Sequence, residues 1–202
     1  MMGKKCSRHA ALLAAAGIVL AVSCDSLFST RDPEPPVNSQ SGWKQPLSPE
    51  QVLLNMQSAV AERHVENFVR CLVNASFSEE TFRFEPDPDV SADHAGVFDG
   101  WTVAKEQTVI QQAFSLVPMD SSSLLAFGEE IWQSISADEA VYDALYTLEL
   151  PHTRSSLSTS FEGRLTFTLS PDQRGEWSIH HWIDNAVGDS PCWSLLKAVL
   201  GG

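Results

Sequence analysis

Apolar and polar residues alternate along three stretches in the second half of the chain, and this alternation restricts the fold more than any other feature. The apolar positions are Tyr142, Ala144, Tyr146, Leu148 and Leu150, then Phe161, Leu165, Phe167 and Leu169, then Trp177, Ile179, His181 and Ile183. Successive side chains of a strand point to opposite faces, so a period of two indicates strands with one buried face, as in antiparallel sheets. Residues 171–175 supply a hairpin turn, and residues 124–135 supply a further strand. The sequence therefore predicts a meander of four long strands.

The first half of the chain predicts helices instead. Residues 48–51, Ser-Pro-Glu-Gln, combine a capping serine, a proline at the first helical position and the glutamine of a capping box. The expected elements are helices at 49–62, at 65–73 and from 101, a short strand at 81–84, an acidic loop at 87–100 and a short helix from 191. Helices followed by a meander predict an α+β fold, in which three N-terminal helices pack on a curved antiparallel sheet.

The N-terminus predicts export. Lys4, Lys5 and Arg8 precede an uncharged, mostly apolar run over 10–22, which is shorter than the roughly 20 residues that a membrane-spanning helix needs. Small residues then lead to Cys24. Residues 1–23 are therefore interpreted as a signal peptide.

The end of this segment, Leu20-Ala21-Val22-Ser23-Cys24, resembles the lipobox of bacterial lipoproteins, although Ala21 stands where that pattern prefers leucine. The resemblance implies that Cys24 becomes the first mature residue and carries acyl chains such as palmitate, which anchor the chain in the cell envelope on the periplasmic side. An ordinary secretory signal, cut near Ser23 and leaving Cys24 unmodified, is the alternative. The residue after Cys24, Asp25, does not indicate whether the anchor lies in the inner or the outer membrane. Prolines mark residues 24–47 as an extended tether, so the predicted domain covers 48–202.

Charge excludes one class of partner. The chain has 13 basic and 26 acidic residues, a formal charge of -13, and removal of residues 1–23 takes away three basic residues and no acidic one, which gives -16. An acidic surface without a basic patch argues against nucleic acid as a partner. The membrane is reached through the lipid, and not through surface charge.

Over residues 48–187 the domain resembles the nuclear transport factor 2-like superfamily, which includes ketosteroid isomerase, polyketide cyclase-like domains and other cystatin-like α+β cones. The resemblance rests on the order of the elements, on the helix pair within 48–72 and on the strand that begins Gly175-Glu176-Trp177-Ser178-Ile179. It implies a cone with a pocket between the helices and the concave face of the sheet. The chain as a whole also resembles uncharacterised bacterial lipoproteins in which such a domain follows a proline-rich tether.

The isomerase branch of that superfamily uses a tyrosine and carboxylic acids to move a proton beside a carbonyl. The candidate residues here are Tyr142, Tyr146, His181 and Asp184. Alternation places both tyrosines on one face and Asp143 on the other, His181 on the apolar face, and Asp184 on the polar face toward solvent. No complete catalytic set results.

No metal or cofactor is predicted. Acidic residues crowd one loop, at Glu85, Asp87, Asp89 and Asp93, and are expected to be solvated. A calcium loop starting at Asp87 fails, because Ala92 and Phe98 occupy its glycine and glutamate positions. Neighbouring histidines at 180 and 181 point to opposite faces of a strand and cannot share one zinc ion.

Two cysteines remain after export, Cys71 and Cys192. They form either one disulfide or two separate buried thiols. Ser194-Leu195-Leu196-Lys197 matches the S-x-x-K of penicillin-binding enzymes and is treated as a coincidence.

Two functions fit these observations. The first is a membrane-anchored, non-catalytic domain that binds a small apolar ligand or a protein partner, with a second copy of the chain among the candidate partners. The alternative is a small isomerase-like or cyclase-like enzyme that uses a tyrosine and a buried acid in the cone.

Overall fold

The computed structural model describes residues 42–202, so the predicted signal peptide, Cys24 and the tether up to residue 41 lie outside the described residues. The elements are α2 (Pro49–Glu62), α3 (Val65–Arg70), β1 (Arg83–Glu85), α4 (Pro88–Asp93), α5 (Val103–Leu116), β2 (Leu124–Ile135), β3 (Ala140–Glu149), β4 (Ser160–Pro171), β5 (Trp177–Ala186) and α6 (Trp193–Gly201). Within this part of the chain, no helix combines the length and apolar character that crossing a membrane requires.

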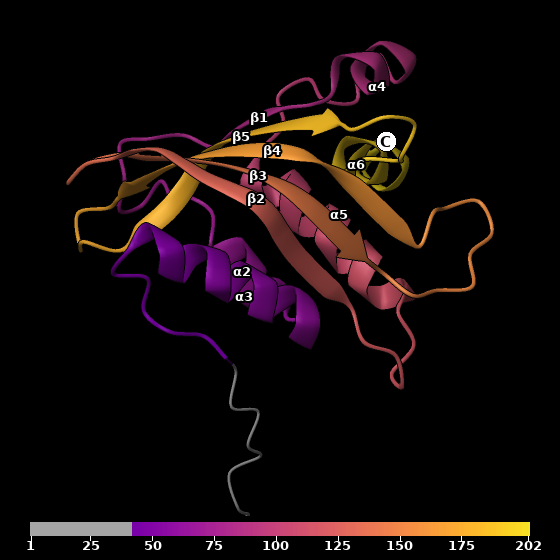
Figure 1. Cartoon of the computed structure of the whole chain (residues 1–202), viewed down its shortest axis with the longest axis horizontal. Helices are drawn as coiled ribbons and strands as arrows, with labels where there is room; N and C mark the ends of the chain where they lie inside the picture. The colour runs from indigo at the N-terminus through magenta and orange to yellow at the C-terminus, as the bar shows by residue number, and fades with distance from the viewer. Residues whose placement is uncertain (1–41) are drawn as a thin grey trace, which may run out of the picture. The chain divides into compact units, whose positions relative to one another are not determined.

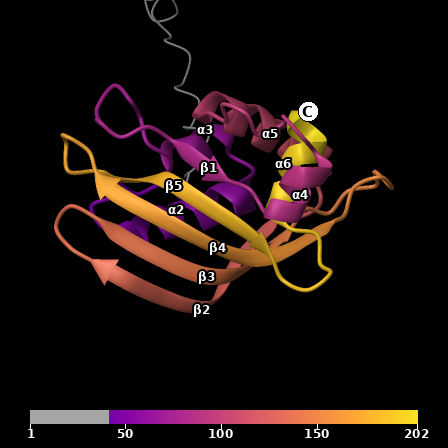
Figure 2. The same ribbon diagram turned by 90° about the horizontal axis from the view of Figure 1, so that it is seen from above.

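The five strands form one sheet in the order β1-β5-β4-β3-β2. Strands β2 to β5 pair antiparallel as a meander, and β1 joins the outer side of β5 in parallel. Figure 1 and Figure 2 show α2, α3 and α5 on one side of the sheet, which curves around them, while α6 packs beside β4 and β5. The predicted α+β class, with its curved antiparallel sheet and short C-terminal helix, is confirmed.

Side-chain caps explain where the helices begin. The Ser48 hydroxyl accepts from the Gln51 amide at 3.4 Å at the start of α2, and Thr102 caps α5 in the same way at 3.3 Å. The Gln51 side chain bonds Asn55 instead of returning to Ser48, so the expected capping box is only half formed. Arg63 ends α2 with a left-handed φ of 55°, which separates α2 from α3 as the interrupted periodicity predicted.

Helix α3 ends at Arg70, three residues before the predicted end. The backbone that follows pairs with β5 instead: Ile179 N–H donates to the Cys71 carbonyl at 2.9 Å, and Val73 N–H donates to the Ile179 carbonyl at 2.9 Å. These long-range hydrogen bonds satisfy backbone groups that a longer helix would have used internally.

The acidic loop predicted over 87–100 contains a short helix, α4, and the loop prediction is wrong there. The Asp87 carboxylate accepts from the Asp89 and Val90 amides, and Pro88 occupies the first helical turn. Helix α4 buries none of its own residues. It therefore shows no apolar periodicity, and only its cap signals it.

A β-bulge at His180 shifts the alternation of β5. Thr168 pairs with His181, but the next residue, Leu169, pairs with Ile179, so His180 is an extra residue on β5. Beyond the bulge Trp182 and Asp184 face the core instead of His181 and Ile183, and both are fully buried. The predictions that His181 lies on the apolar face and that Asp184 meets solvent are therefore wrong.

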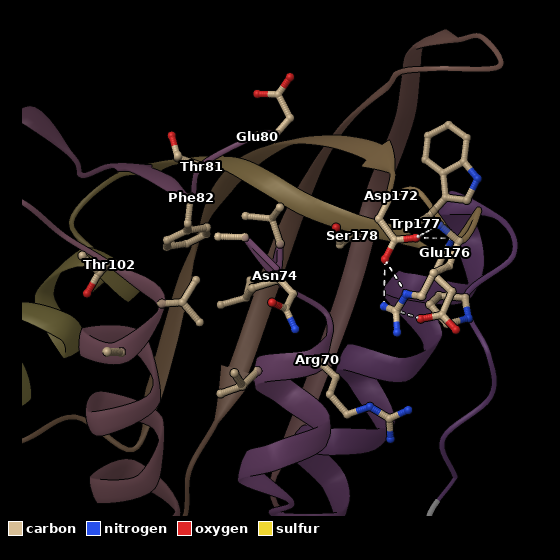
Figure 3. Close-up of a pocket in the computed structure, with 18 of the residues that line it drawn as sticks. Arg70, Asn74, Glu80, Thr81, Phe82, Thr102, Asp172, Glu176, Trp177 and Ser178 are labelled. Carbon is tan, nitrogen blue, oxygen red and sulfur yellow. Dashed lines mark hydrogen bonds and ion pairs between the residues drawn. The ribbon is translucent and has the colours of Figure 1, made fainter. Parts of the chain in front are cut away.

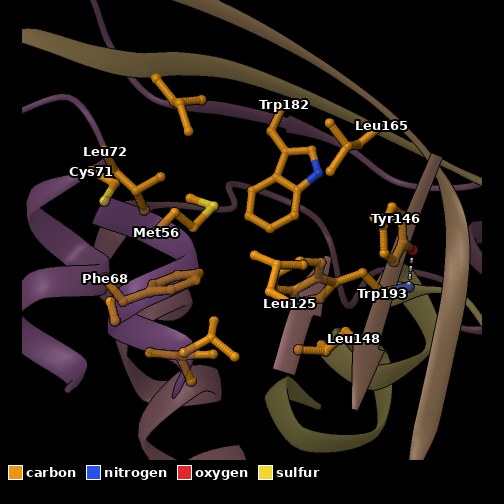
Figure 4. Packing of buried hydrophobic residues seen from close by; sticks show 14 of the residues in the cluster. Met56, Phe68, Cys71, Leu72, Leu125, Tyr146, Leu148, Leu165, Trp182 and Trp193 are labelled. Carbon is orange, nitrogen blue, oxygen red and sulfur yellow. Dashed lines mark hydrogen bonds between the residues drawn. The ribbon is translucent and has the colours of Figure 1, made fainter. Parts of the chain in front are cut away.

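Aromatic side chains fill the space between the sheet and the helices. Trp182 and Trp193 meet edge to face with ring centroids 4.7 Å apart, and Phe68 lies 6.2 Å from Trp193 (Figure 4). All three are fully buried. The protein's own side chains, among them Trp193 of α6, thus occupy this part of the space between the sheet and the helices.

Candidate functional site

A hydrogen-bonded tyrosine and carboxyl group lie inside the cone. Tyr146 Oη donates to Asp184 Oδ1 at 2.8 Å and accepts from the Trp193 backbone N–H at 2.6 Å. Gly163 pairs with Tyr146 across the sheet, and a Cβ at Gly163 would come within 2.7 Å of the Tyr146 hydroxyl. The absence of a side chain at Gly163 therefore makes room for this pair.

Helix α6 closes over the other oxygen of Asp184. The Ser194 backbone N–H and hydroxyl both donate to Asp184 Oδ2, at 2.6 and 2.5 Å. Burial raises the pKa of Asp184 above its ordinary value, and hydrogen bonds from Ser194 and Tyr146 oppose this shift. Burial and the neighbouring Asp184 charge raise the pKa of Tyr146 well above its ordinary value.

Such a pair has the chemical character that proton transfer beside a carbonyl needs, namely a hydroxyl donor and a buried acid. Here both groups are committed to hydrogen bonds within the protein. Asp184 is fully buried, and only 3% of Tyr146 is exposed. The bulge at His180 and the cover provided by α6 bring the two residues together, and neither feature has a local sequence signature.

A second buried polar group lies further along α6. Lys197 Nζ lies 3.0 Å from Glu106 Oε2, which also accepts from Trp101 Nε1 at 2.8 Å. The rings of Phe84 and Trp182 have their centroids 3.4 Å from the same ammonium. Burial lowers the pKa of Lys197 to about 8, although the charge and hydrogen bond of Glu106 oppose the shift.

Ser194 and Lys197, both on α6, therefore bind different partners. Ser194 bonds Asp184, whereas Lys197 pairs with Glu106. Both residues are fully buried. Their S-x-x-K spacing does not create an accessible nucleophile.

The remaining candidates lie apart from the Tyr146 and Asp184 pair. Tyr142 is buried against Phe127 and Trp132, and its hydroxyl makes no aligned hydrogen bond with a described residue. Burial, followed by the nearby Glu130 carboxylate, raises the pKa of Tyr142. His181 bonds the Glu85 carboxylate at 3.0 Å.

Asp143 belongs to the opposite face of the sheet. Its carboxylate accepts from Arg164 and from the Thr166 hydroxyl. The face that carries Tyr142 and Tyr146 thus excludes Asp143, as alternation along the strand requires.

In the structure Cys71 and Cys192 are both free, buried thiols. Cys71 Sγ donates to the Asn67 carbonyl at 3.3 Å at the end of α3, whereas Cys192 precedes α6. Burial raises the pKa of Cys71, and burial together with the Asp184 charge raises that of Cys192 to about 11.

Asp87 of the acidic cluster has a structural role. The prediction that it is solvated is wrong, because Asp87 is buried. One carboxylate oxygen caps α4, and the other accepts from the Ala186 backbone N–H at 2.9 Å. Over residues 42–202, no group of three or more His, Cys, Asp or Glu side chains is placed to hold a metal ion.

An open crevice of about 610 Å³ lies between α3, the start of α5 and the β4–β5 hairpin (Figure 3). Its lining comes from five separate segments: Trp43 and Pro46; Val69, Arg70, Leu72, Val73, Asn74 and Ala75; Glu80, Thr81 and Phe82; Thr102, Val103 and Ala104; and Asp172, Arg174, Glu176, Trp177 and Ser178. Tyr146 and Asp184 are not among the lining residues. Because the segments are distant in sequence, no sequence pattern could have identified this site.

At the polar end of the crevice, Arg174 forms ion pairs with two neighbouring carboxylates. Arg174 bonds Asp172 at 2.7 Å and Glu176 at 2.8 Å, and its guanidinium stacks on Phe77 at 3.9 Å. Burial alone would raise the pKa of Asp172, but hydrogen bonds from the Arg174 side chain and from backbone amides outweigh it and lower that pKa.

No protein-family model matches the chain, and no curated protein matches its sequence. The described fold is nevertheless that of nuclear transport factor 2-like proteins. An NTF2-like protein of unknown function in nutrient uptake from Rhodospirillum rubrum is similar with a TM-score of 0.50 and 8% identity, covering 70% of this chain and 99% of that one. A dehydratase candidate of the NTF2-like family from Streptomyces avermitilis gives a TM-score of 0.50 and 7% identity, covering 69% and 93%. Likenesses at this identity show the fold alone.

Proposed function

We propose that this chain is an exported lipoprotein whose NTF2-like domain is a non-catalytic binding module. In this proposal Cys24 carries the acyl anchor in the cell envelope, and the predicted 24–47 tether spaces the domain from the membrane. The end of that segment belongs to the domain, because the Pro46 carbonyl accepts from the Trp177 N–H at 2.7 Å. The crevice beside α3 takes a small ligand. The observation that carries the proposal is that the polar groups suited to catalysis and the open crevice lie in different parts of the domain. The polar groups suited to catalysis are enclosed under α6, whereas the open space lies elsewhere on the domain.

The crevice has the size and surface of a binding site. Pockets that hold small ligands usually measure about 300–1,000 Å³ and combine an apolar lining with a few polar groups. The crevice measures about 610 Å³. Phe82 and Val103, which are only partly buried, supply apolar surface, while Thr81 and Ser178 supply hydroxyl groups.

Binding is tested on the mature chain from residue 24 with Cys24→Ser, which carries no acyl chain. Mass spectrometry of the freshly purified protein under native conditions is expected to find a small molecule of constant mass. Amide NMR signals around Leu72 and Val73 are expected to shift when that molecule is removed. Signals that move only around Tyr146 and Asp184 would transfer the binding site to the cone interior and contradict the proposal.

The anchor is tested separately in intact cells. Metabolic labelling with an alkyne analogue of palmitate is expected to label the wild-type chain and not Cys24→Ser, which also leaves the membrane fraction. Cys6→Ser is the matched control, since its cysteine lies inside the signal peptide. Equal labelling of Cys24→Ser would refute the lipoprotein assignment.

An isomerase-like or cyclase-like enzyme is the second candidate function. The observation that favours it is the Tyr146 hydroxyl held 2.8 Å from the Asp184 carboxyl, whose pKa is raised by burial. Catalysis would require α6 to uncover this pair. Deuterium uptake from solvent beside the carbonyl of a cyclic ketone, present in wild type and absent in Tyr146→Phe, would favour the enzyme over the binding module.

A further inference from the structure

We propose that the crevice binds a small amphiphile with one anionic head on an apolar body, an inference that rests on the proposed binding function. The apolar body lies on the floor of the crevice. The head meets the guanidinium of Arg70 at the rim.

The floor of the crevice is apolar and already well packed. Leu72, Val73 and Trp177 are 2%, 4% and 8% exposed, so they form a firm surface beneath the opening. Phe82 and Val103 are partly buried and flank this floor. The floor itself has little exposed area left to cover. A ligand body that covers the exposed parts of Phe82 and Val103 removes apolar area from water, which is favourable.

Arg70 supplies the charge that selects the head. Its guanidinium carbon lies 3.9 Å from the centroid of the Trp43 ring, so the planar group is oriented by stacking. Among the described residues, Arg70 makes no ion pair with a carboxylate. Stacking on a ring leaves the N–H edges of a guanidinium able to donate two parallel hydrogen bonds to a carboxylate.

The other charged groups of the crevice do not compete for this role. Arg174 pairs with both Asp172 and Glu176, so this cluster of one guanidinium and two carboxylates is net negative and offers no cation to an anionic head. Glu80 points away from the crevice in Figure 3, and its carboxylate lies 3.8 Å from His180 Nδ1. Without residues 1–23 the chain has a formal charge of -16 and repels anions at long range, which favours a head with a single charge over a polyanion.

The experiment compares three ligands with the same eight-carbon body. Octanoate, 1-octanol and octyltrimethylammonium are titrated into the mature Cys24→Ser chain, and amide NMR shifts locate each binding site. Octanoate is expected to shift signals of Leu72, Val73 and Val103 with an affinity at least about tenfold above that of octanol, since about tenfold is the contribution of a single hydrogen bond to a charged group and the guanidinium can donate two. The cation is expected to bind more weakly than octanol.

Variants identify the residue that reads the charge. Arg70→Gln is expected to remove the preference for octanoate and leave octanol binding unchanged, while Arg70→Lys restores part of it. Arg83→Gln is the matched control, because Arg83 is 70% exposed in its side chain, pairs with Glu85 and does not line the crevice.

The outcomes separate this inference from the function on which it rests. If octanol and octanoate bind the crevice equally well and Arg70→Gln changes neither, the anionic head is refuted and the binding module stands. If no ligand shifts the crevice signals, both proposals fail. Binding of octanoate in the crevice that depends on Arg70 supports both.

Discussion

Replacing Tyr146 by phenylalanine tests whether the buried pair holds the fold together. The substitution keeps the ring, which stacks 5.6 Å from Trp193, and removes one hydroxyl. That hydroxyl donates to Asp184 at 2.8 Å and accepts from the Trp193 N–H at 2.6 Å. Its loss leaves an oxygen of Asp184 and a backbone N–H without their partners in the core.

The size of the effect follows from these two bonds. A hydrogen bond to a charged group contributes about 1.5–3 kcal/mol, and a buried N–H left without a partner costs about 1–3 kcal/mol. Because both losses arise from one hydroxyl and the core relaxes, we expect Tyr146→Phe to lower the free energy of unfolding by about 3 kcal/mol. At about 2–4 °C per kcal/mol for a chain of this size, the melting temperature falls by about 9 °C.

Tyr142→Phe is the matched control on the same face of the same strand. The Tyr142 hydroxyl is also buried but makes no aligned hydrogen bond with a described residue, so we expect its loss to cost less than about 1 kcal/mol. Urea unfolding followed by tryptophan fluorescence and circular dichroism measures both variants. Equal losses, or a loss under 1 kcal/mol for Tyr146→Phe, would refute the reasoning. Octanoate binding is expected to survive in Tyr146→Phe, because Tyr146 does not line the crevice.

Other predictions follow from the buried groups around this pair. Lys197→Met leaves the Glu106 carboxylate buried without its cation and is expected to cost about 4 kcal/mol in urea unfolding, more than half of which Glu106→Gln restores in the double variant. Burial lowers the pKa of Lys197 from 10.5 to about 8, so between these pH values the unfolded chain binds more protons than the folded chain. The free energy of unfolding, measured relative to Lys197→Met, is therefore expected to rise by about 1 kcal/mol from pH 7 to pH 9. A decrease over this range would contradict the buried location of Lys197. Gly163→Ala brings a Cβ within 2.6 Å of a backbone carbonyl oxygen, and we expect thermal unfolding to show a loss of about 2 kcal/mol. Alkylation of the unfolded, unreduced chain carrying Cys24→Ser is expected to label both Cys71 and Cys192, whereas a mass without labels would indicate a disulfide.

The secondary structure was largely predictable because its signals are local. Ser48 and Thr102 cap helices within three residues of themselves, and each strand of the meander shows its own alternation. The errors have equally definite causes. Helix α4 was missed because it buries no residue, and α3 was predicted too long because residues 71–73 pair with Ile179, which is distant in sequence.

The candidate site was predictable only in its parts. The sequence indicates both Tyr146 and Asp184 as candidates, but strand alternation predicts that Asp184 faces solvent. One extra residue, His180, reversed the faces of β5 beyond it and brought Asp184 under Tyr146. The bulge depends on how β5 pairs with β4, so the sequence of β5 alone does not predict it.

The sequence alone determined the α+β class and the order of most elements, because caps, turns and hydrophobic periods act over a few neighbouring residues. It also supports the export signal and the Cys24 prediction, which lie outside the described residues. Tertiary structure decided what lies in the interior and what remains open. Helix α6 covers Asp184 through Ser194, and five distant segments form the crevice with Arg70 at its rim. These arrangements depend on contacts between residues far apart in the chain, and such contacts exist only once the sheet has closed around its helices.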